Sequence, residues 1–553
     1  MKILFYLLVL VLPQFLLGQD FYLHLEGQNE EETKIITLLE YEKKHKSVAL
    51  LLENQEQFYK KLVYSGYIDA ALLSQKKTND SSFVMRYALG VQLKYCKISC
   101  KKLNPVTRQL LAISQDTITL PTTELVQFLE KNLSNLEKNG YLLASLQLAT
   151  LKKERDYLSA TLEVELNQPR TLSGIEIIGY PTFPVGVRKA IFRNARKKVF
   201  NQANLDEIQQ AFGKLLFVNQ LKYPEILFTK DSTKVFVYLE KSKPNRFDGY
   251  IGFSNDKAQK LVFNGYLDLQ LQNILNKGEY LNLYWKNDGN KQTTFQLGAE
   301  LPYLMRSPLG IKTNLRLFKQ DSLFQNTQLD LHLGYYFSYN TKLFAGLQQT
   351  TSVAIQKTNT LNVYDFSNSF ITSSFDYLNP NLDSYLFREK TKIKAKIGFG
   401  SRTHLGKKEG QYFGQLEWSH HFQWGSRHSI MLKQHNYYLH SSTYISNELY
   451  RFGGIHSLRG FSENSLQANF FSGLMTEYRY LVASNLYVHS VFDYGIQQDK
   501  STKLNTQLRG IGFGFGLLTK NVMLHFVYAN GGNYEKFNNL NNSVVQISVN
   551  TKF

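Results

Sequence analysis

Apolar and polar residues alternate with a period of two through the second half of the chain. The last segment shows the alternation well, because single polar residues separate Val545, Ile547 and Val549 on the way to Phe553. Such alternation predicts β-strands with one apolar and one polar face. A soluble β-sandwich alternates too, but it needs a second apolar layer, which this region lacks. The pattern therefore predicts a closed barrel whose apolar face meets lipid.

The alternating segments predict sixteen strands, an even number as expected of bacterial membrane barrels. The longest connection covers residues 442–469, between the eleventh and twelfth strands, and is expected to lack regular structure. A loop of that length inside a compact domain is usually functional or disordered. We expect the strands to begin near residues 245, 258, 277, 291, 308, 324, 341, 368, 385, 411, 427, 470, 484, 508, 521 and 544.

The first part of the chain combines helical patterns with short strands. Its unit of one strand, two helices and two strands repeats, and Gly66 and Gly140, each followed by tyrosine, close equivalent helices 74 positions apart. Thr122 or Thr123 is expected to cap the helix of the second unit, and Asn204 that of the third. The chain is thus predicted to consist of α+β repeats at residues 20–92, 93–169 and 170–243, followed by the barrel at 245–553.

The N-terminus has the pattern of a cleaved secretory signal peptide covering residues 1–18. Lys2 precedes an apolar run at residues 3–12, which ends at Pro13, and the small residue Gly18 follows. A membrane anchor is the alternative, but this run is too short to span the roughly 30 Å of a bilayer's hydrocarbon. Export of the chain is therefore expected.

Composition and charge narrow the functional class. The 553 residues are 43% hydrophobic and carry a formal net charge of +19. The cations are scattered over alternating strands without the stripe of aromatic residues and arginines that would indicate a nucleic-acid surface. A positive surface facing solvent, the barrel lumen or anionic lipid headgroups accounts for them better, and no nucleic-acid partner is expected.

The sequence offers little for catalysis or metal binding. Gly-x-Ser-x-Gly and His-Glu-x-x-His motifs are absent, and His420 and His421 would lie on opposite faces of one strand. The only cysteines, Cys96 and Cys100, would be about 13 Å apart on an extended strand, so free thiols are favoured over a disulfide. We expect no enzyme activity, no cofactor and no metal.

One group of residues predicts a charge cluster inside the barrel, in which a loop arginine is bound by carboxylates of the wall. Arg459 lies in the long loop, in the segment Leu458, Arg459, Gly460 and Phe461, while Glu477 and Asp493 fall on the polar face of later strands. A guanidinium can bind carboxylates through paired, charge-assisted hydrogen bonds that lysine cannot reproduce. An exposed loop arginine is the simpler alternative.

A row of glycines at period two follows these acidic residues. The row would leave one strip of wall without side chains, where the loop backbone could pack. A phosphate-binding loop is excluded because the spacing is strictly two and no helix follows. The glycines are Gly510, Gly512, Gly514 and Gly516.

Together these features resemble the Omp85 superfamily, with the N-terminal units similar to its POTRA domains. The family's loop motif usually has valine where this chain has Leu458, whereas Arg459, Gly460 and Phe461 match. The resemblance implies that Glu477 and Asp493 hold the arginine from the lumen. It also implies that Phe553 is a terminal aromatic by which such barrels are recognised during assembly.

The resemblance implies a bacterial outer-membrane protein with its POTRA region in the periplasm. Like the BamA-type and TamA-type members, it would help nascent outer-membrane proteins into the membrane, with outer-membrane lipid and periplasmic or lipoprotein accessory subunits as further partners. Client strands would add to a POTRA sheet edge and pass to the seam between the first and last barrel strands. Gly249 and Gly252 are expected to weaken pairing at this seam.

Two other functions remain open at this point. A two-partner-secretion export pore for one dedicated substrate shares the architecture, but it usually has two POTRA units and a plug helix. A passive porin would account for the barrel but would leave the repeats and Arg459 without a role.

Overall fold

The computed structural model describes residues 20–255, 261–287, 292–356, 362–382, 384, 386–533 and 543–553. The expected signal peptide lies outside this range. The described chain separates into two compact units, of which one ends at Thr171 and also takes Val199–Ala203. The other takes Leu172–Lys198 and Asn204–Phe553. Each unit is described by itself below.

The first unit begins with an α+β repeat in which helices pack on a mixed sheet of order β2-β1-β4-β3. Leu23, Leu51 and Met85 are fully buried in its core. Since β1 pairs with β4 in parallel, the connection between them has to cross over, and the helices make that crossing. Its elements are β1 (Phe21–Gly27), α2 (Glu30–Leu38), β2 (Lys44–His45), α3 (Val48–Tyr64), β3 (Ala71–Asn79) and β4 (Ser82–Ala88).

The second repeat has the same plan, with sheet order β6-β5-β8-β7. Cys96 and Cys100 are buried, free thiols in its core. Burial raises the pKa of the Cys96 thiol to about 11, so it stays protonated and unreactive at neutral pH. The elements are β5 (Tyr95–Ser99), α4 (Pro105–Leu111), β6 (Thr117–Pro121), η1 (Thr122–Glu124), α5 (Leu125–Lys138), β7 (Ser145–Glu154) and β8 (Tyr157–Glu165).

The glycines that mark the repeat end their helices in the same way. Gly66 and Gly140 have φ angles of 94° and 91°, in the left-handed region that favours glycine. The amide of Tyr67 donates to the carbonyl of Leu62, and Tyr141 repeats this bond to its own helix, as in a Schellman cap. The shared signal therefore has a geometric cause.

The third repeat belongs to the same compact unit as the barrel. Its central strand β12 pairs with β9 on one side and with β10 and β11 on the other. Phe212, Phe217 and Val237 are fully buried in its interior. The elements are β9 (Leu172–Ile178), α6 (Val185–Ala195), α7 (Gln202–Gly213), β10 (Val218–Gln220), β11 (Glu225–Phe228) and β12 (Thr233–Lys241).

Both helix caps expected from the sequence are wrong. Asn204 is not a cap, since α7 begins at Gln202, and its side-chain amide donates to the carbonyl of Ala195. Thr122 starts the η1 turn, and its hydroxyl donates to the carbonyl of Leu93, 2.6 Å away. Each polar side chain satisfies a buried carbonyl from a distant segment, which a local capping pattern cannot reveal.

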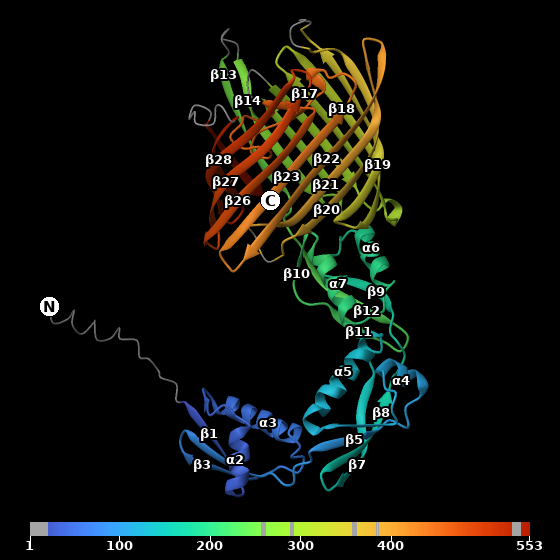
Figure 1. Ribbon diagram of the computed structural model, residues 1–553, viewed down its shortest axis with the longest axis vertical. Helices are drawn as coiled ribbons and strands as arrows, with labels where there is room; N and C mark the ends of the chain where they lie inside the picture. Colours follow the sequence, from blue (N-terminus) through green and yellow to red (C-terminus); the bar gives the residue numbers. More distant parts are fainter. Residues whose placement is uncertain are drawn as a thin grey trace, which may run out of the picture. The chain divides into compact units, whose positions relative to one another are not determined.

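The second half forms a closed antiparallel barrel, as expected (Figure 1). The sixteen strands in the described residues each begin within four positions of the predicted starts. They are β13 (Arg246–Asn255), β14 (Leu261–Gln272), β15 (Tyr280–Asn287), β16 (Gln292–Leu301), β17 (Leu309–Gln320), β18 (Phe324–Ser338), β19 (Thr341–Ala354), β20 (Phe366–Pro380), β21 (Glu389–His404), β22 (Lys407–Trp424), β23 (His428–His440), β26 (Phe470–Ala483), β27 (Leu486–Asp499), β28 (Leu504–Leu518), β29 (Val522–Asn533) and β30 (Ser543–Lys552).

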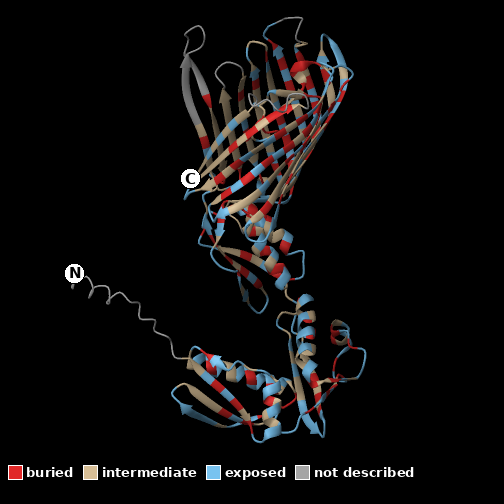
Figure 2. Cartoon of the chain, turned by 60° about the vertical axis from the view of Figure 1, so that its left-hand side comes forward, coloured by how far each residue is buried: buried red, intermediate tan, exposed pale blue. Residues whose placement is uncertain are grey.

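The two faces of the barrel wall differ sharply, and exposure alternates along the strands in Figure 2. On β18 the outward residues Leu331, Leu333 and Phe337 are exposed, while the inward Asp330 and His332 are buried. An apolar outer face suits hydrocarbon, where strands can pair all of their backbone groups only if they form a closed barrel. No helix within the described ranges is long and apolar enough to cross a membrane.

Inward-facing charges pair with one another across the lumen. Lys312 lies 2.7 Å from Asp376, and Lys396 lies 3.2 Å from Asp330. These pairs join strands that are not neighbours in the wall. The lumen on this side is therefore filled by side chains that hold one another.

The long connection after β23 has some regular structure, contrary to expectation. It contains the short turn η3 (Ser446–Glu448) and a small antiparallel ribbon of β24 (Tyr450–Phe452) and β25 (Leu466–Ala468). Residues 453–465 form the tip of this ribbon and include Arg459. We call residues 441–469 the lumenal loop.

Candidate functional site: the lumenal loop and the barrel seam

A small hydrophobic cluster fixes the lumenal loop to the barrel wall. Leu458, with none of its surface exposed, packs with Phe452, Phe471 and Leu508. The rings of Phe452 and Phe471 stack with centroids 3.9 Å apart. Leu458 is thus an apolar anchor of the lumenal loop.

Arg459 is buried among acidic and backbone acceptors, with only 4% of its surface exposed. Its Nε donates to Oδ2 of Asp493 over 2.9 Å, and Nη2 donates to the other oxygen of the same carboxylate. Nη1 donates to Glu477, and Nη2 also donates to the carbonyl of Thr476. The backbone amide of Arg459 adds a further bond to Asp493. This is the bidentate geometry that lysine cannot make.

A second arginine, which sequence reasoning missed, completes this charge cluster. Arg479 Nε donates to Oε2 of Glu477 over 2.7 Å, so two guanidinium groups and two carboxylates form one network. Arg479 is two residues from Glu477 on β26, and an i, i+2 spacing puts both on the lumenal face. That spacing was the available signal. The network is balanced in charge, as burial demands.

Gly460 permits the closest approach between the lumenal loop and the wall. Its φ is 84°, and a Cβ there would lie 2.5 Å from the amide nitrogen of Gly531 on β29. Gly531 was not singled out from the sequence, although the pair Gly531 and Gly532 stands out inside a predicted strand. The ring of Phe461 covers Gly531 from the lumen and packs against the hydrophobic cluster.

The glycine row on β28 serves more than the lumenal loop. A Cβ at Gly510 would meet the carbonyl oxygen of Arg459, so this position makes room for the loop. At Gly514 and Gly516 the nearest side chains are the rings of His489 and Tyr487, and at Gly512 it is the backbone of β29. One glycine of the row therefore faces the loop, and two lie under aromatic rings from the neighbouring strand β27.

The far end of the lumenal loop reaches the opposite wall. Glu463 accepts a hydrogen bond of 2.9 Å from the hydroxyl of Tyr284 and forms an ion pair with Lys286. Both partners lie on β15. Gln292 on β16 donates to the carbonyl of Asn464 at 3.5 Å. Sequence reasoning missed these residues, because nothing local links a loop glutamate to a strand about 180 positions earlier.

The seam between β13 and β30 is weakly paired. Within the described residues, only Arg246 with Lys552 and Phe247 with Thr551 are in register, whereas β29 and β30 share nine pairs. One side-chain bond, from the Ser548 hydroxyl to Asp248 over 3.0 Å, also crosses the seam. Beyond Phe247 the backbone ladder to β30 is lost.

The predicted seam glycines lie on β13, in its ladder with β14. A Cβ at Gly249 would lie 2.6 Å from the carbonyl oxygen of Tyr266 on β14. Gly252 is in register with Asn264 in the same β13–β14 ladder. Phe553 follows β30 with 48% of its surface exposed, and its amide donates to the carbonyl of Asn245. The chain end thus closes the barrel beside its first strand.

The third repeat is joined to the barrel turns by polar contacts, of which one is buried. Asn273, fully buried, donates to the Tyr180 hydroxyl over 2.9 Å. Asn340 donates to the carbonyl of Lys214, and Asn194 to that of Phe337. Barrels of this kind have short turns on the periplasmic side. The third repeat contacts short turns such as residues 339–340, so it lies at an end of the barrel where strands are joined by short turns.

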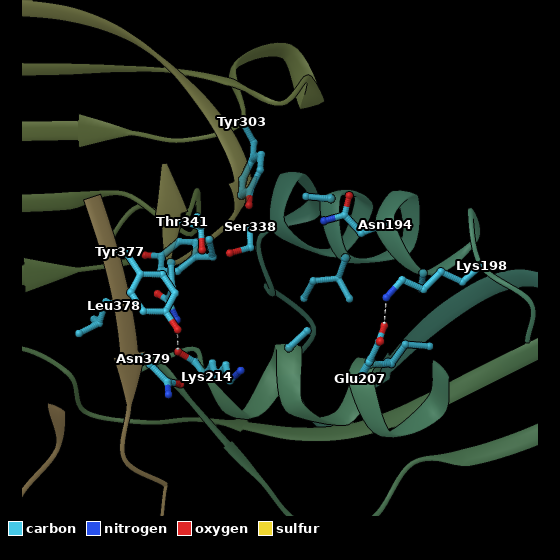
Figure 3. A pocket seen from close by; sticks show the side chains of 17 residues that line it. Asn194, Lys198, Glu207, Lys214, Tyr303, Ser338, Thr341, Tyr377, Leu378 and Asn379 are labelled. Carbon is cyan, nitrogen blue, oxygen red and sulfur yellow. Dashed lines mark hydrogen bonds and ion pairs between the residues drawn. The ribbon is translucent and has the colours of Figure 1, made fainter. Parts of the chain in front are cut away.

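A pocket of about 190 Å³ lies at this junction (Figure 3). Asn194 and Lys198 line it from the end of α6, while Glu207 and Lys214 line it from the side of α7. Lys198 forms an ion pair with Glu207 between the two helices. Tyr303 and Tyr377 close the pocket from the barrel. The polar groups here pair among themselves and present no reactive set.

The described residues contain no cluster of three or more His, Cys, Asp or Glu side chains placed to hold a metal. The Arg459 network binds charge with charge and offers neither a nucleophile nor a general base. A polar lumenal cavity of about 310 Å³ lies beside the loop and is lined by Asn368, Lys396 and Glu417 among others. What the described contacts show is a lumenal loop held against the barrel wall by the Arg459 network.

Comparisons with known proteins agree with this architecture. No family model and no curated protein matches the chain. CdiB from Escherichia coli is similar in structure, with 14% identity and a TM-score of 0.52, covering 95% of this chain and 98% of its own. CdiB from Acinetobacter baumannii has 14% identity and a TM-score of 0.51, covering 90% of this chain and 98% of its own. BamA from Haemophilus ducreyi lacking POTRA domains 1–3 has 15% identity and a TM-score of 0.48, covering 82% of this chain and 98% of its own.

At such low identities the likeness concerns the fold. The CdiB structures match nearly the whole length of this chain, including residues before the barrel. The α+β repeats, the closed barrel with an apolar outer face and the inward loop occur here together. The chain therefore has the fold of the CdiB structures, an Omp85-type arrangement of POTRA-like repeats ahead of a barrel whose described residues form sixteen strands.

Proposed function

We propose that this protein helps client polypeptides enter or cross the outer membrane by opening the barrel at the β13–β30 seam. The observation that carries this proposal is the short ladder of two residue pairs in the described strands, against nine in the adjacent β29–β30 ladder. Missing ladder bonds leave edge groups available to another strand. A client strand could pair there without any input of chemical energy.

The periplasmic repeats could receive clients before the seam does. β3 and β7 lie at the outer edges of their sheets and are largely exposed. An extended client segment can add to such an edge by β-augmentation. Both edge strands have register irregularities and paired lysines, Lys76 with Lys77 and Lys152 with Lys153, which discourage permanent edge-to-edge association. Transient capture is the mode that these edges favour.

Export of one dedicated substrate is the second candidate. The polar cavity beside the lumenal loop supports it, because amide and charged groups such as Gln348 and Glu417 would solvate a passing chain. For export the loop has to leave the lumen, whereas assembly at the seam leaves the loop in place. The two functions therefore require different parts of the barrel to move.

A disulfide across the seam tests the proposal. The residues of the pair Phe247 and Thr551 lie opposite each other, and opposed residues of an antiparallel ladder are close enough to bridge when both are cysteine. We expect the oxidised F247C/T551C protein to stop inserting an unfolded barrel client into liposomes that contain the purified full chain. Reduction should restore insertion. The native thiols are buried and should not interfere.

The matched control is F526C/I547C, which bridges β29 and β30 at a pair already inside a complete ladder. Oxidised control protein should insert the client normally. Full activity of the oxidised seam variant would refute gating at this seam. In cells, depletion of the protein should lower many outer-membrane barrels if it assembles them, and the loss of a single secreted protein would favour export instead.

A further inference from the structure

Helix α6 and the segment after it carry a group of cations without acidic partners. Lys189, Arg193, Arg196 and Lys197 make no ion pair with any acidic residue in the described ranges, and neither does Arg306 in the barrel turn beside them. The neighbouring Arg188 and Lys198 differ, because they pair with Glu176 and Glu207. We call the five unpaired cations the basic surface.

Three cations of the basic surface share one side of the helix. Lys189 and Arg193 are four positions apart on α6 and Arg196 caps its end, whereas Lys197 follows in the turn after the helix. The opposite face of α6 is packed, since Val187 and Ala190 are buried. Arg193 also donates to the carbonyl of Arg306 at 3.3 Å, and this bond joins the helix to turn η2 (Leu304–Arg306).

The basic surface adjoins the lipid-facing wall. Asn194 on α6 donates to the carbonyl of Phe337, the last outward apolar residue of β18 before the turn. Phe337 is 52% exposed, and Met305 in the η2 turn is fully exposed. Figure 1 shows α6 at the barrel rim where these strands end. Exposed apolar side chains followed directly by cations are the order of groups met at a membrane surface.

Close packing fixes the direction of the basic surface. A Cβ at Gly186 would lie 2.8 Å from Cβ of Tyr303, so the start of α6 is in direct contact with the barrel turn. Tyr303 itself is buried, with φ of 56°. The helix therefore cannot turn its cations away from the membrane without breaking this junction.

We propose that the basic surface binds acidic phospholipid headgroups of the periplasmic leaflet and so holds the third repeat against the membrane. Phosphate oxygens would replace the acidic partners that these cations lack, and Met305 would enter the interface. The binding rests on the barrel lying in the outer membrane and holds for assembly and export alike. It would keep the last repeat in one orientation while a client passes to the seam.

Headgroup selection by the purified full chain tests this proposal. The protein would be equilibrated with phosphatidylglycerol and phosphatidylethanolamine of matched acyl chains, and the retained lipids counted by native mass spectrometry. We expect a preference for phosphatidylglycerol that falls about fivefold for each charge removed in K189Q/R196Q/K197Q. These side chains are exposed, so folding should persist. Heat-modified gel mobility would check it.

The matched control is K234Q/K241Q/K243Q, which removes the same charge from β12 and the residues just after it. It should keep the preference for phosphatidylglycerol. An equal loss in both triple variants would overturn the proposal, because the effect would then be one of net charge. The proposal would also be overturned if K189Q/R196Q/K197Q kept the preference for phosphatidylglycerol, or if the unmodified protein showed no headgroup preference. If the triple variant fails to fold, K189R/R196K/K197R should fold and keep the preference, and loss of the preference there would also refute it.

Discussion

The lumenal loop contacts two sides of the barrel, and the two contacts differ in kind. On the wall of β26 to β29, Arg459 and Asp493 are 4% and 0% exposed and bind through several hydrogen bonds. On the wall of β15, Glu463 and Lys286 are 32% and 35% exposed and bind through one ion pair and a tyrosine hydroxyl. The seam lies between these two walls.

The difference shows which wall would keep the loop if the seam opened. A buried charge left without its partner costs several kcal/mol, whereas a half-exposed ion pair is replaced by water for about 1 kcal/mol or less. The Glu463 contact should therefore break first. The lumenal loop would stay with the C-terminal strands and release the N-terminal ones.

Removing the strong contact should have the largest effect. Arg459→Ala leaves the carboxylates of Glu477 and Asp493 buried, with one guanidinium, that of Arg479, remaining for both. We expect a loss of about 3 to 5 kcal/mol in the free energy of unfolding. Arg459→Lys should recover only part of it, since lysine cannot bind both oxygens of Asp493. Heat-modified gel mobility and urea titration of the folded barrel would measure both.

The control for Arg459 is Arg427→Ala, because Arg427 is an exposed arginine in the turn between β22 and β23. It should change stability by less than about 0.5 kcal/mol. If Arg459→Ala and Arg427→Ala behave alike, the network does not hold the loop, and the contrast between the two walls disappears.

Gly460→Ala should have the next largest effect. The substitution forces a side chain into the left-handed region and toward the amide of Gly531, 2.5 Å away. We expect about 2 to 4 kcal/mol of destabilisation, of which about 1 to 2 kcal/mol is conformational and the rest comes from the close contact. Gly406→Ala separates the two causes, since its φ is 74° but no atom lies within 4 Å of a Cβ there. Equal destabilisation by both variants would show that the contact with β29 is unimportant.

Some parts of this molecule could be predicted from sequence because their causes are local. A period of two follows directly from strand geometry, so the barrel strands were placed within a few residues. Glu477 and Asp493 could be assigned to the lumen by the same rule, and Arg459 is the cation that the long loop presents to them. Periodicity tells which face of the wall a residue occupies. Here the lumenal face was enough to identify Glu477 and Asp493 as partners of Arg459.

Other parts could not be predicted, because they depend on where distant strands meet. Gly531 faces Gly460 only through the register of β29, and Glu463 meets Lys286 only because the loop spans the lumen. The weak seam results from pairs that are missing between β13 and β30. Gly249, which the sequence suggested as its cause, lies just after the last of these pairs and close to the carbonyl oxygen of Tyr266 on β14.

Weakening the Glu463 contact should have the smallest effect on stability. It tests most directly whether the two walls hold the lumenal loop with different strength. Glu463→Gln removes the ion pair with Lys286 at a cost of about 0.5 to 1 kcal/mol. We expect amide exchange to rise a few-fold in residues 461–466 and to stay unchanged at residues 458–460. Asp376→Asn breaks a comparable lumenal pair with Lys312 that does not involve the loop, so exchange in the loop should not change. If exchange rises equally from 458 to 466, the loop moves as one body, and the strong contact cannot hold it while the weak one releases.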